Sequence, residues 1–269
     1  WTQPTAGNAG YYAVRAVDVF GNESADSLAA APDLALETRS ADAAARLRVP
    51  SIVAAPLFAD GNSFGEDIRL ELTRAPGEEG GRVLLSYAIS PIRAASGLSA
   101  EEGLVFPKAR VEISFKVPGL GPAAADPNVA VFWHDGVGWI NMGGEVDPAT
   151  GLVTVRTARL GRFQVRESLR ASNFTLLQIV PNKIFTPNGD GVNDSIQFFF
   201  DNPTDTVVSG AKIYDITGAE VSEMRLGTSS NSLVWDGRDA SGSPASSGIY
   251  IYQFQGGGKT LNGTVVVAR

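Results

Sequence analysis

Residues 184–196 read IFTPNGDGVNDSI, and this stretch decides how the C-terminal third of the chain folds. Seven of the eight residues from Pro187 to Asp194 are proline, glycine, asparagine or aspartate. These residue types favour tight turns, through a fixed φ, a positive φ or a side-chain hydrogen bond to the backbone. Phe185 precedes the turn, and Ile196 begins an apolar stretch after it. The stretch therefore predicts a strand, a tight turn and another strand.

The same alternation of strand and turn continues to residue 269. Strand-like segments are separated by turn signals such as Thr217-Gly218 and Asp236-Gly237. Short strands that alternate with turns are typical of an all-β sandwich. The expected strands cover residues 212–216, 220–224, 233–235, 248–254 and 264–268.

Two motifs in this region carry a family resemblance. PNKIFTPNGDGVND resembles the opening motif of the gliding-motility-associated C-terminal domain that ends many secreted proteins of Bacteroidota. VWDGRDASGSPASSGIYIYQF and GTVVVAR resemble the Ig-like domain of the flagellar hook-capping protein. The resemblance implies a seven-stranded Ig-like sandwich at residues 178–269. It also implies export by a type 9-like secretion route that reads this domain as a sorting signal. The chain departs from many sorting domains, which end on a lysine-containing tail, because it ends in Ala268-Arg269.

Residues 48–168 form a second series of strand candidates, spaced by roughly ten residues, and predict a middle β-sandwich. The stretch 131–165 resembles the closing hairpins of ZU5-type and autoproteolytic modules of bacterial surface proteins. It lacks their self-cleavage dipeptide, because His134 is followed by Asp135-Gly136. Residues 31–47 are alanine-rich and are expected to be a linker, with one or two helical turns at Ala41–Leu47. A shorter linker is expected at 169–177.

The first thirty residues contain GYYAVRAVDVFGNES, at positions 10–24. This segment resembles the last strands of a fibronectin type III domain, so residues 1–30 are expected to be the C-terminal strands of such a domain. An ordinary edge hairpin is the alternative. Because the chain begins at Trp1 without a methionine, we expect it to be a portion of a longer protein.

Composition excludes several classes of chemistry. The chain has 269 residues, no cysteine and one histidine, with 22 basic and 29 acidic residues for a net charge of −7. Disulfide scaffolds and cysteine-ligated zinc sites are therefore excluded, and a nucleophile–histidine site would have to use His134. The acidic balance argues against a nucleic-acid partner. No apolar run reaches the roughly 18 residues of a membrane span.

The turn at 186–194 is a candidate calcium site. Asn188, Asp190, Val192 and Asp194 fall at positions 3, 5, 7 and 9 of an EF-type loop, which offers hard oxygen ligands to calcium. The positions 1 and 12 would be Thr186 and Gln197 instead of stronger carboxylate ligands. The alternative is a turn held by its own hydrogen bonds. A second acidic turn, Asp236–Asp239, is expected to be such a hydrogen-bonded turn and could lie nearby.

Trp133 and Trp139 flank the His134-Asp135 turn and are candidate platforms for stacking a glycan. The alternative is a hairpin whose aromatic residues alternate into the core. Trp235, Tyr250 and Tyr252 are expected in the core or on a sheet face.

These observations predict an all-β chain of tandem antiparallel sandwiches with an Ig-like C-terminal domain. The expected function is non-catalytic: a structural spacer and an export or surface-attachment module of a secreted or cell-surface bacterial adhesin, fibre or appendage. Its partners would be export machinery or surface components, with self-assembly through edge strands. One alternative is the tail of a secreted protease or glycoside hydrolase whose catalytic domain precedes Trp1. A weaker alternative is a carbohydrate-binding module. Calcium is the one cofactor considered.

Overall fold

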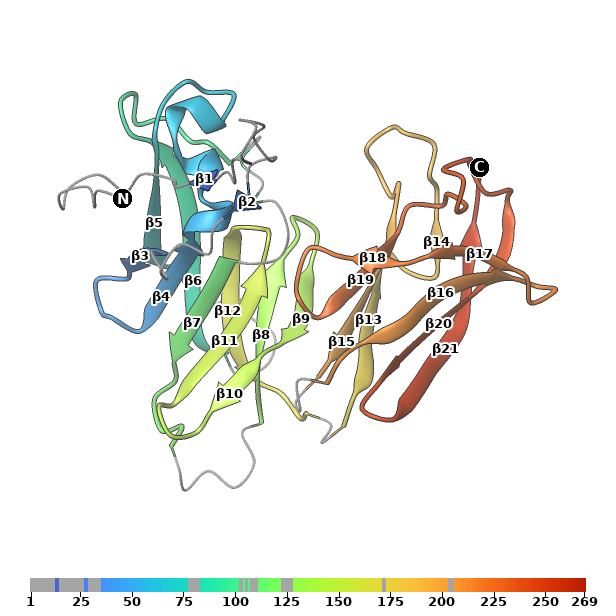
Figure 1. Ribbon diagram of the computed structural model, residues 1–269. Coiled ribbons are helices and arrows are strands. Elements are labelled where there is room, and N and C mark those ends of the chain that lie inside the picture. The colour runs from blue at the N-terminus through green and yellow to red at the C-terminus, as the bar shows by residue number, and fades with distance from the viewer. Residues whose placement is uncertain are drawn as a thin grey trace, which may run out of the picture.

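The computed structural model describes residues 13–14, 27–28, 35–76, 83–101, 104, 106, 111–121, 128–170, 173–202 and 206–269. The regular structure of these residues is almost entirely strand (Figure 1). Three single turns of 3-10 helix interrupt it, at Ser51–Val53, Ala55–Leu57 and Ala59–Gly61. No helix among the described residues has the length and apolarity needed to cross a membrane. The predicted all-β fold of tandem antiparallel sandwiches is confirmed.

The middle sandwich consists of two five-stranded antiparallel sheets. The first sheet has the order β10-β11-β7-β4-β3, and the second has the order β5-β6-β12-β8-β9. The first sheet contains β3 (Ala35–Arg39), β4 (Ala45–Pro50), β7 (Val111–Lys116), β10 (Glu145–Asp147) and β11 (Leu152–Thr157). The second contains β5 (Ile68–Arg74), β6 (Val83–Arg93), β8 (Val129–His134), β9 (Trp139–Gly143) and β12 (Gly161–Glu167).

Alternating residues fill the space between these two sheets. In β4, Ala45, Leu47 and Val49 are buried, while the arginines between them are half-buried on the outer face. Tyr87 and Phe115 meet in the core at a ring-centroid distance of 6.0 Å. This two-residue period is the pattern expected of strands with one face on the core.

The prediction of a linker at residues 31–47 is wrong for residues 35–47, which the structure describes. Residues 35–39 and 45–50 form the hairpin β3–β4, and β4 also pairs with β7 in the first sheet. The expected helical turns at Ala41–Leu47 are absent, and the backbone turns at Ala43, whose φ is 56°. Burial of Ala45 and Leu47 against β7 outweighs the intrinsic helix preference of alanine, which is small per residue. Thr175, placed in the second predicted linker, begins strand β13.

The predicted fibronectin-like strands at residues 1–30 lie outside the described residues, apart from two short strands. These are β1 (Ala13–Val14) and β2 (Ser27–Leu28), which pair antiparallel with each other.

The C-terminal sandwich has one four-stranded and one five-stranded sheet. Their orders are β13-β15-β19-β18 and β14-β21-β20-β16-β17, and β14 pairs parallel with β21. The four-stranded sheet contains β13 (Thr175–Val180), β15 (Ile196–Asp201), β18 (Arg225–Leu226) and β19 (Ser232–Trp235). The five-stranded sheet contains β14 (Ile184–Phe185), β16 (Ser209–Asp215), β17 (Glu220–Glu223), β20 (Gly248–Gly256) and β21 (Lys259–Val267).

Aromatic rings dominate the core of this sandwich. Trp235 lies 5.1 Å from Tyr250 and 5.4 Å from Phe185, measured between ring centroids. Phe198 contacts Tyr252 at 4.7 Å. Large rings in edge-on and tilted contact bury much apolar area, which compensates for the absence of disulfides. The expectation that Trp235, Tyr250 and Tyr252 are core residues is confirmed.

Candidate functional sites

The turn after β14 is held by its own carboxylates. Oδ1 of Asp194 accepts the N–H of Gly189 at 2.6 Å, and Oδ2 accepts the N–H of Gly191 at 2.7 Å. Asp190 accepts the N–H of Val192 at 2.7 Å and the side-chain amide of Asn188 at 2.9 Å. The amide of Asn188 and the N–H of Val192 lower the pKa of Asp190, in that order of importance. This is the geometry of a hydrogen-bonded turn.

The four predicted calcium ligands therefore lie together, but the carboxylate oxygens of Asp190 and Asp194 already accept hydrogen bonds. Calcium takes six to eight oxygen ligands, usually with several carboxylates. Among the described residues, no group of three or more histidine, cysteine or acidic side chains could hold a metal. The two aspartates would need backbone carbonyls and water to complete a calcium shell, so calcium stays a prediction from the sequence, and the hydrogen bonds of the turn favour the alternative of a self-held turn.

The second acidic turn lies beside the first, as the sequence suggested. Gly237 has a φ of +70°, and a Cβ built on it would lie 2.7 Å from Cγ of Pro187. Oδ1 of Asp239 accepts the N–H groups of Ser241 and Ser243, both at 2.9 Å. The hydroxyl of Ser241 is the main cause that lowers the pKa of Asp239. Glycine at 237 thus allows the two turns to pack together. The second turn is also tied to the rest of the sandwich, because Arg225 binds the carboxylate of Asp236.

The two candidate tryptophans of the middle sandwich lie on opposite faces of its second sheet. Trp133 pairs with Ile140 across β8 and β9, packs against the core, and donates its indole N–H to the carbonyl of Leu160 at 2.9 Å. Trp139 pairs instead with His134, in edge contact at 4.9 Å. The two rings therefore cannot sandwich or share one ligand.

A guanidinium already covers the ring of Trp139. The Cζ of Arg166 lies 4.7 Å from the centroid of Trp139 and 4.8 Å from that of Phe132. This arrangement is a cation–π stack, which is typically worth about 0.5–1 kcal/mol at an exposed site. The Cζ of Arg162 also lies 5.7 Å from the centroid of Trp139, so a glycan that stacked on this ring would compete with two guanidinium groups. The glycan-binding hypothesis now rests on Trp139.

The junction between the sandwiches was not predicted. Ser230 donates its N–H to the carbonyl of Arg156 at 3.0 Å, and Ala158 donates to the carbonyl of Thr228 at 2.8 Å. Thr157 and Ser229 form a β-bridge at the same place. The side-chain amide of Asn231 donates to the carbonyls of both Met142 and Phe200. Loops of the C-terminal sandwich are therefore hydrogen-bonded to strands of the middle one.

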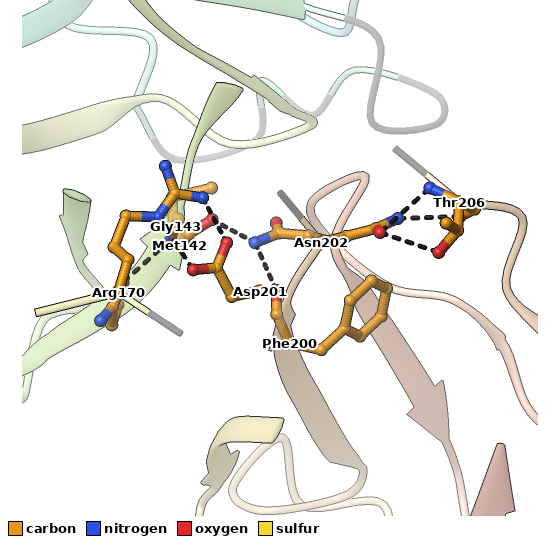
Figure 2. A network of polar contacts seen from close by, with 9 residues as sticks. Met142, Gly143, Arg170, Phe200, Asp201, Asn202 and Thr206 are labelled. Carbon is orange, nitrogen blue, oxygen red and sulfur yellow. Dashed lines mark hydrogen bonds and ion pairs between the residues drawn. The ribbon is translucent and has the colours of Figure 1, made fainter. Parts of the chain in front are cut away.

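A buried ion pair lies beside these hydrogen bonds. The guanidinium of Arg170 binds both oxygens of Asp201, with 2.9 Å from Nε to Oδ2 (Figure 2). The Asp201 side chain is 2% exposed and that of Arg170 is 11% exposed. Gly143 has a φ of +65°, and a Cβ there would lie 2.8 Å from Oδ1 of Asp201. A side chain at position 143 would therefore displace the carboxylate.

Apolar contact completes the junction. Phe199 of β15 is buried but belongs to neither sandwich core, and β15 contacts β9 of the middle sandwich. A cavity of about 70 Å³ remains beside Asp201 and Asn231. Burial, a bridge and an ion pair together hold the two sandwiches in one orientation, side by side (Figure 1).

Comparison with known proteins identifies part of the chain. The model of the FlgD Ig-like domain family matches residues 182–258. A search of curated proteins found no match. Among solved structures, dimeric latent PorU from Porphyromonas gingivalis is similar with a TM-score of 0.26 and 12% identity. That similarity covers 74% of this chain and 28% of the PorU chain. The family match identifies the C-terminal sandwich as an Ig-like domain.

Proposed function

We propose that this chain is a non-catalytic part of a secreted or cell-surface bacterial protein, and that its Ig-like sandwich is an export and attachment module. The observation that carries the proposal is the turn at 186–194. The opening motif that resembles gliding-motility C-terminal domains forms one compact, exposed, self-supported turn at the entrance of the domain that matches the FlgD Ig-like family. Such a turn presents a fixed shape that export machinery could read.

The middle sandwich serves in this proposal as a spacer. The junction supports that role, because a spacer must hold its neighbour at a set distance and angle. The backbone bridge between Thr157 and Ser229 and the buried pair of Arg170 and Asp201 supply that constraint. Adhesins, fibres and appendages are the classes of surface protein that use such segments.

The export role is tested in the bacterium that produces the protein. We expect the full-length protein to reach the cell surface, measured by antibody labelling of intact cells. Deletion of residues 173–269 is expected to retain the protein inside the outer membrane. Asp194→Ala is expected to reduce surface labelling several-fold, whereas Asp239→Ala, which alters the other acidic turn, leaves it unchanged.

The opposite results would overturn the proposal. Equal surface labelling of the deletion variant would remove the export role of the domain. Equal labelling of the Asp194→Ala and wild-type proteins, at equal total protein, would remove the role of the turn.

A further inference from the structure

Asn188 and Gly189 form an Asn-Gly pair in the exposed turn after β14. In such a pair the backbone nitrogen of glycine can attack the side-chain amide carbon of asparagine and close a five-membered ring. Glycine favours this reaction because it has no side chain to obstruct the attack. The sequence contains one further Asn-Gly pair, Asn262-Gly263, in strand β21. The chain therefore offers two positions with the same chemistry in different structural surroundings.

Hydrogen bonds of the turn surround the reacting atoms of Asn188. The attacking nitrogen, that of Gly189, donates its hydrogen to Oδ1 of Asp194 at 2.6 Å. Negative charge develops on Oδ1 of Asn188 during the attack, and this oxygen accepts the N–H of Asp190 at 3.0 Å. The leaving nitrogen, Nδ2 of Asn188, donates to Oδ2 of Asp190 at 2.9 Å. A proton acceptor, a donor to the developing oxyanion and a contact to the leaving group are thus all in place.

The backbone of the turn is also suited to ring closure. The hydrogen bond from the N–H of Asp190 to Oδ1 of Asn188 folds the asparagine side chain back along its own main chain. Gly189 has a φ of +83°, and a Cβ built on it would meet nothing within 4 Å, so the space around the attacking nitrogen is open. Asn188 and Gly189 are both exposed, so the water that opens the ring can reach them.

The second pair has a different backbone. Asn262 is exposed like Asn188, but it lies in a paired strand, where it is opposite Gln253 of β20 and the following Gly263 is opposite Tyr252. Closing the five-membered ring needs a bent backbone at the asparagine. The extended strand would therefore have to leave its pairing before Asn262 could react.

We propose that Asn188-Gly189 is a self-modification site, at which the turn converts its own asparagine to aspartate and isoaspartate. The bond from the nitrogen of Gly189 to Cγ of Asn188 forms, and the bond from Cγ to Nδ2 breaks. The proton of the Gly189 amide passes to Asp194 and then through water to the leaving nitrogen, which departs as ammonia. Water then opens the ring at either carbonyl. Water is the only other reactant, and nothing is oxidised or reduced.

The conversion changes the turn that opens the Ig-like sandwich. Position 188 gains a negative charge beside Asp190, which loses the hydrogen bond that it accepts from Nδ2 of Asn188. The isoaspartate product also lengthens the main chain before Gly189, and this shifts the N–H of Gly189 relative to Asp194. The turn therefore has two covalent forms, and the share of the second form grows with the age of the protein.

Peptide mapping by mass spectrometry tests the proposal on the full chain, incubated at neutral pH and physiological temperature. Exchange of the amide for a carboxyl group is detected by its mass, and chromatography separates aspartate from isoaspartate. We expect Asn188 to convert at least about tenfold faster than Asn262, because positioning and proton transfer act at the first pair alone. In the chain unfolded by urea the rate at Asn188 should fall and that at Asn262 should rise, until the two are similar.

Asp194→Asn tests the role of the carboxylate. The variant keeps a side-chain oxygen that can accept the N–H of Gly189 but removes the proton acceptor, so conversion at Asn188 should slow at least about tenfold. Asp239→Asn is the matched control, because Asp239 accepts N–H groups in the neighbouring acidic turn, and this variant should convert at the wild-type rate. Thermal unfolding of each variant verifies that it is folded.

Three results would overturn the proposal. The first is equal conversion of Asn188 and Asn262 in the folded chain, including no conversion of either. The second is faster conversion of Asn188 in urea than in the folded chain, which would mean that the turn protects this residue. The third is an Asp194→Asn variant that converts as fast as the wild type or faster, which would mean that the carboxylate does not assist. None of these results depends on export, so the two proposals fail separately.

Discussion

Replacing Asp201 by alanine should destabilise the protein more than any single exposed charge deletion. The side chain of Asp201 is 2% exposed, and both of its oxygens bind Arg170, which is itself only 11% exposed. Removing the carboxylate leaves a guanidinium in a site with little water. Breaking a buried pair from one side typically costs about 3–5 kcal/mol. Because Arg170 keeps some exposure and can turn toward solvent, we expect the lower end, about 3 kcal/mol.

The assay is urea unfolding of the full chain, followed by circular dichroism and tryptophan fluorescence. With a slope of about 2 kcal/mol per molar urea, a loss of about 3 kcal/mol lowers the midpoint by about 1.5 M. Glu220→Ala is the control, because Glu220 pairs with Lys212 at the surface, where a lost ion pair costs at most about 1 kcal/mol.

A double replacement separates the charge from the packing. Arg170→Met with Asp201→Leu removes both charges, and exchange of a buried pair for apolar residues is often neutral in stability. We expect this variant to recover most of the loss of Asp201→Ala. The reasoning is refuted if Asp201→Ala lies within about 0.5 kcal/mol of the wild type, the margin of ordinary surface substitutions.

Four further predictions follow from the remaining geometry. Gly143→Ala should lower the free energy of unfolding by about 2 kcal/mol, because the added Cβ would clash with Asp201 and the backbone at this position has a positive φ. A change below about 0.5 kcal/mol in urea unfolding would contradict the clash. Hydrogen bonds from Ser40 and then Tyr87 lower the pKa of Asp42 from 3.8 to about 2, so the stability they contribute is fully present above pH 3.8 and is lost as the pH falls through about 2. Tyr87→Phe should therefore reduce the acid-dependent loss of stability that unfolding titrations measure. An identical pH profile in the variant and the wild type would exclude a contribution from the Tyr87 hydrogen bond. The thermal midpoint should be the same in calcium and in EDTA, because the carboxylates of Asp190 and Asp194 already accept hydrogen bonds from N–H groups of the loop. A rise in calcium that Asp194→Ala abolishes would instead identify these residues as ligands. Any glycan binding detected on an array should be lost in Trp139→Ala, and binding that survives this substitution would exclude Trp139 as the site. Trp133→Ala should instead lower the free energy of unfolding by about 3 kcal/mol, because Trp133 packs against the core.

Local patterns predicted much of the fold. The turn at 187–194 and the alternating residues of β20 specify a turn and a strand without reference to distant residues, and both are present. The hairpin β3–β4 shows where this reasoning fails. Alanine is frequent in helices and linkers, and only contact with β7 makes Ala45 a core residue of a strand.

The junction could not be predicted for a different reason. Thr157, Ser229 and Asn231 are small polar residues of the kind found in any loop, and more than seventy positions separate the bridged pair. Likewise, the opposite orientation of Trp133 and Trp139 depends on the register of β8 with β9. Such contacts depend on which elements meet in space, and spacing along one sequence does not contain that information.

The junction also determines how the chain would respond to mechanical force. In a surface fibre, tension enters the Ig-like sandwich through the segment between β12 and β13, which contains Arg170. Because Arg170 is bound to Asp201 at the end of β15, and the loops at 228–231 are bonded to β9 and β11, a pull loads several bonds in parallel. Extension would then begin by shearing this junction as a unit, and the two sandwiches would bear tension together until it ruptured.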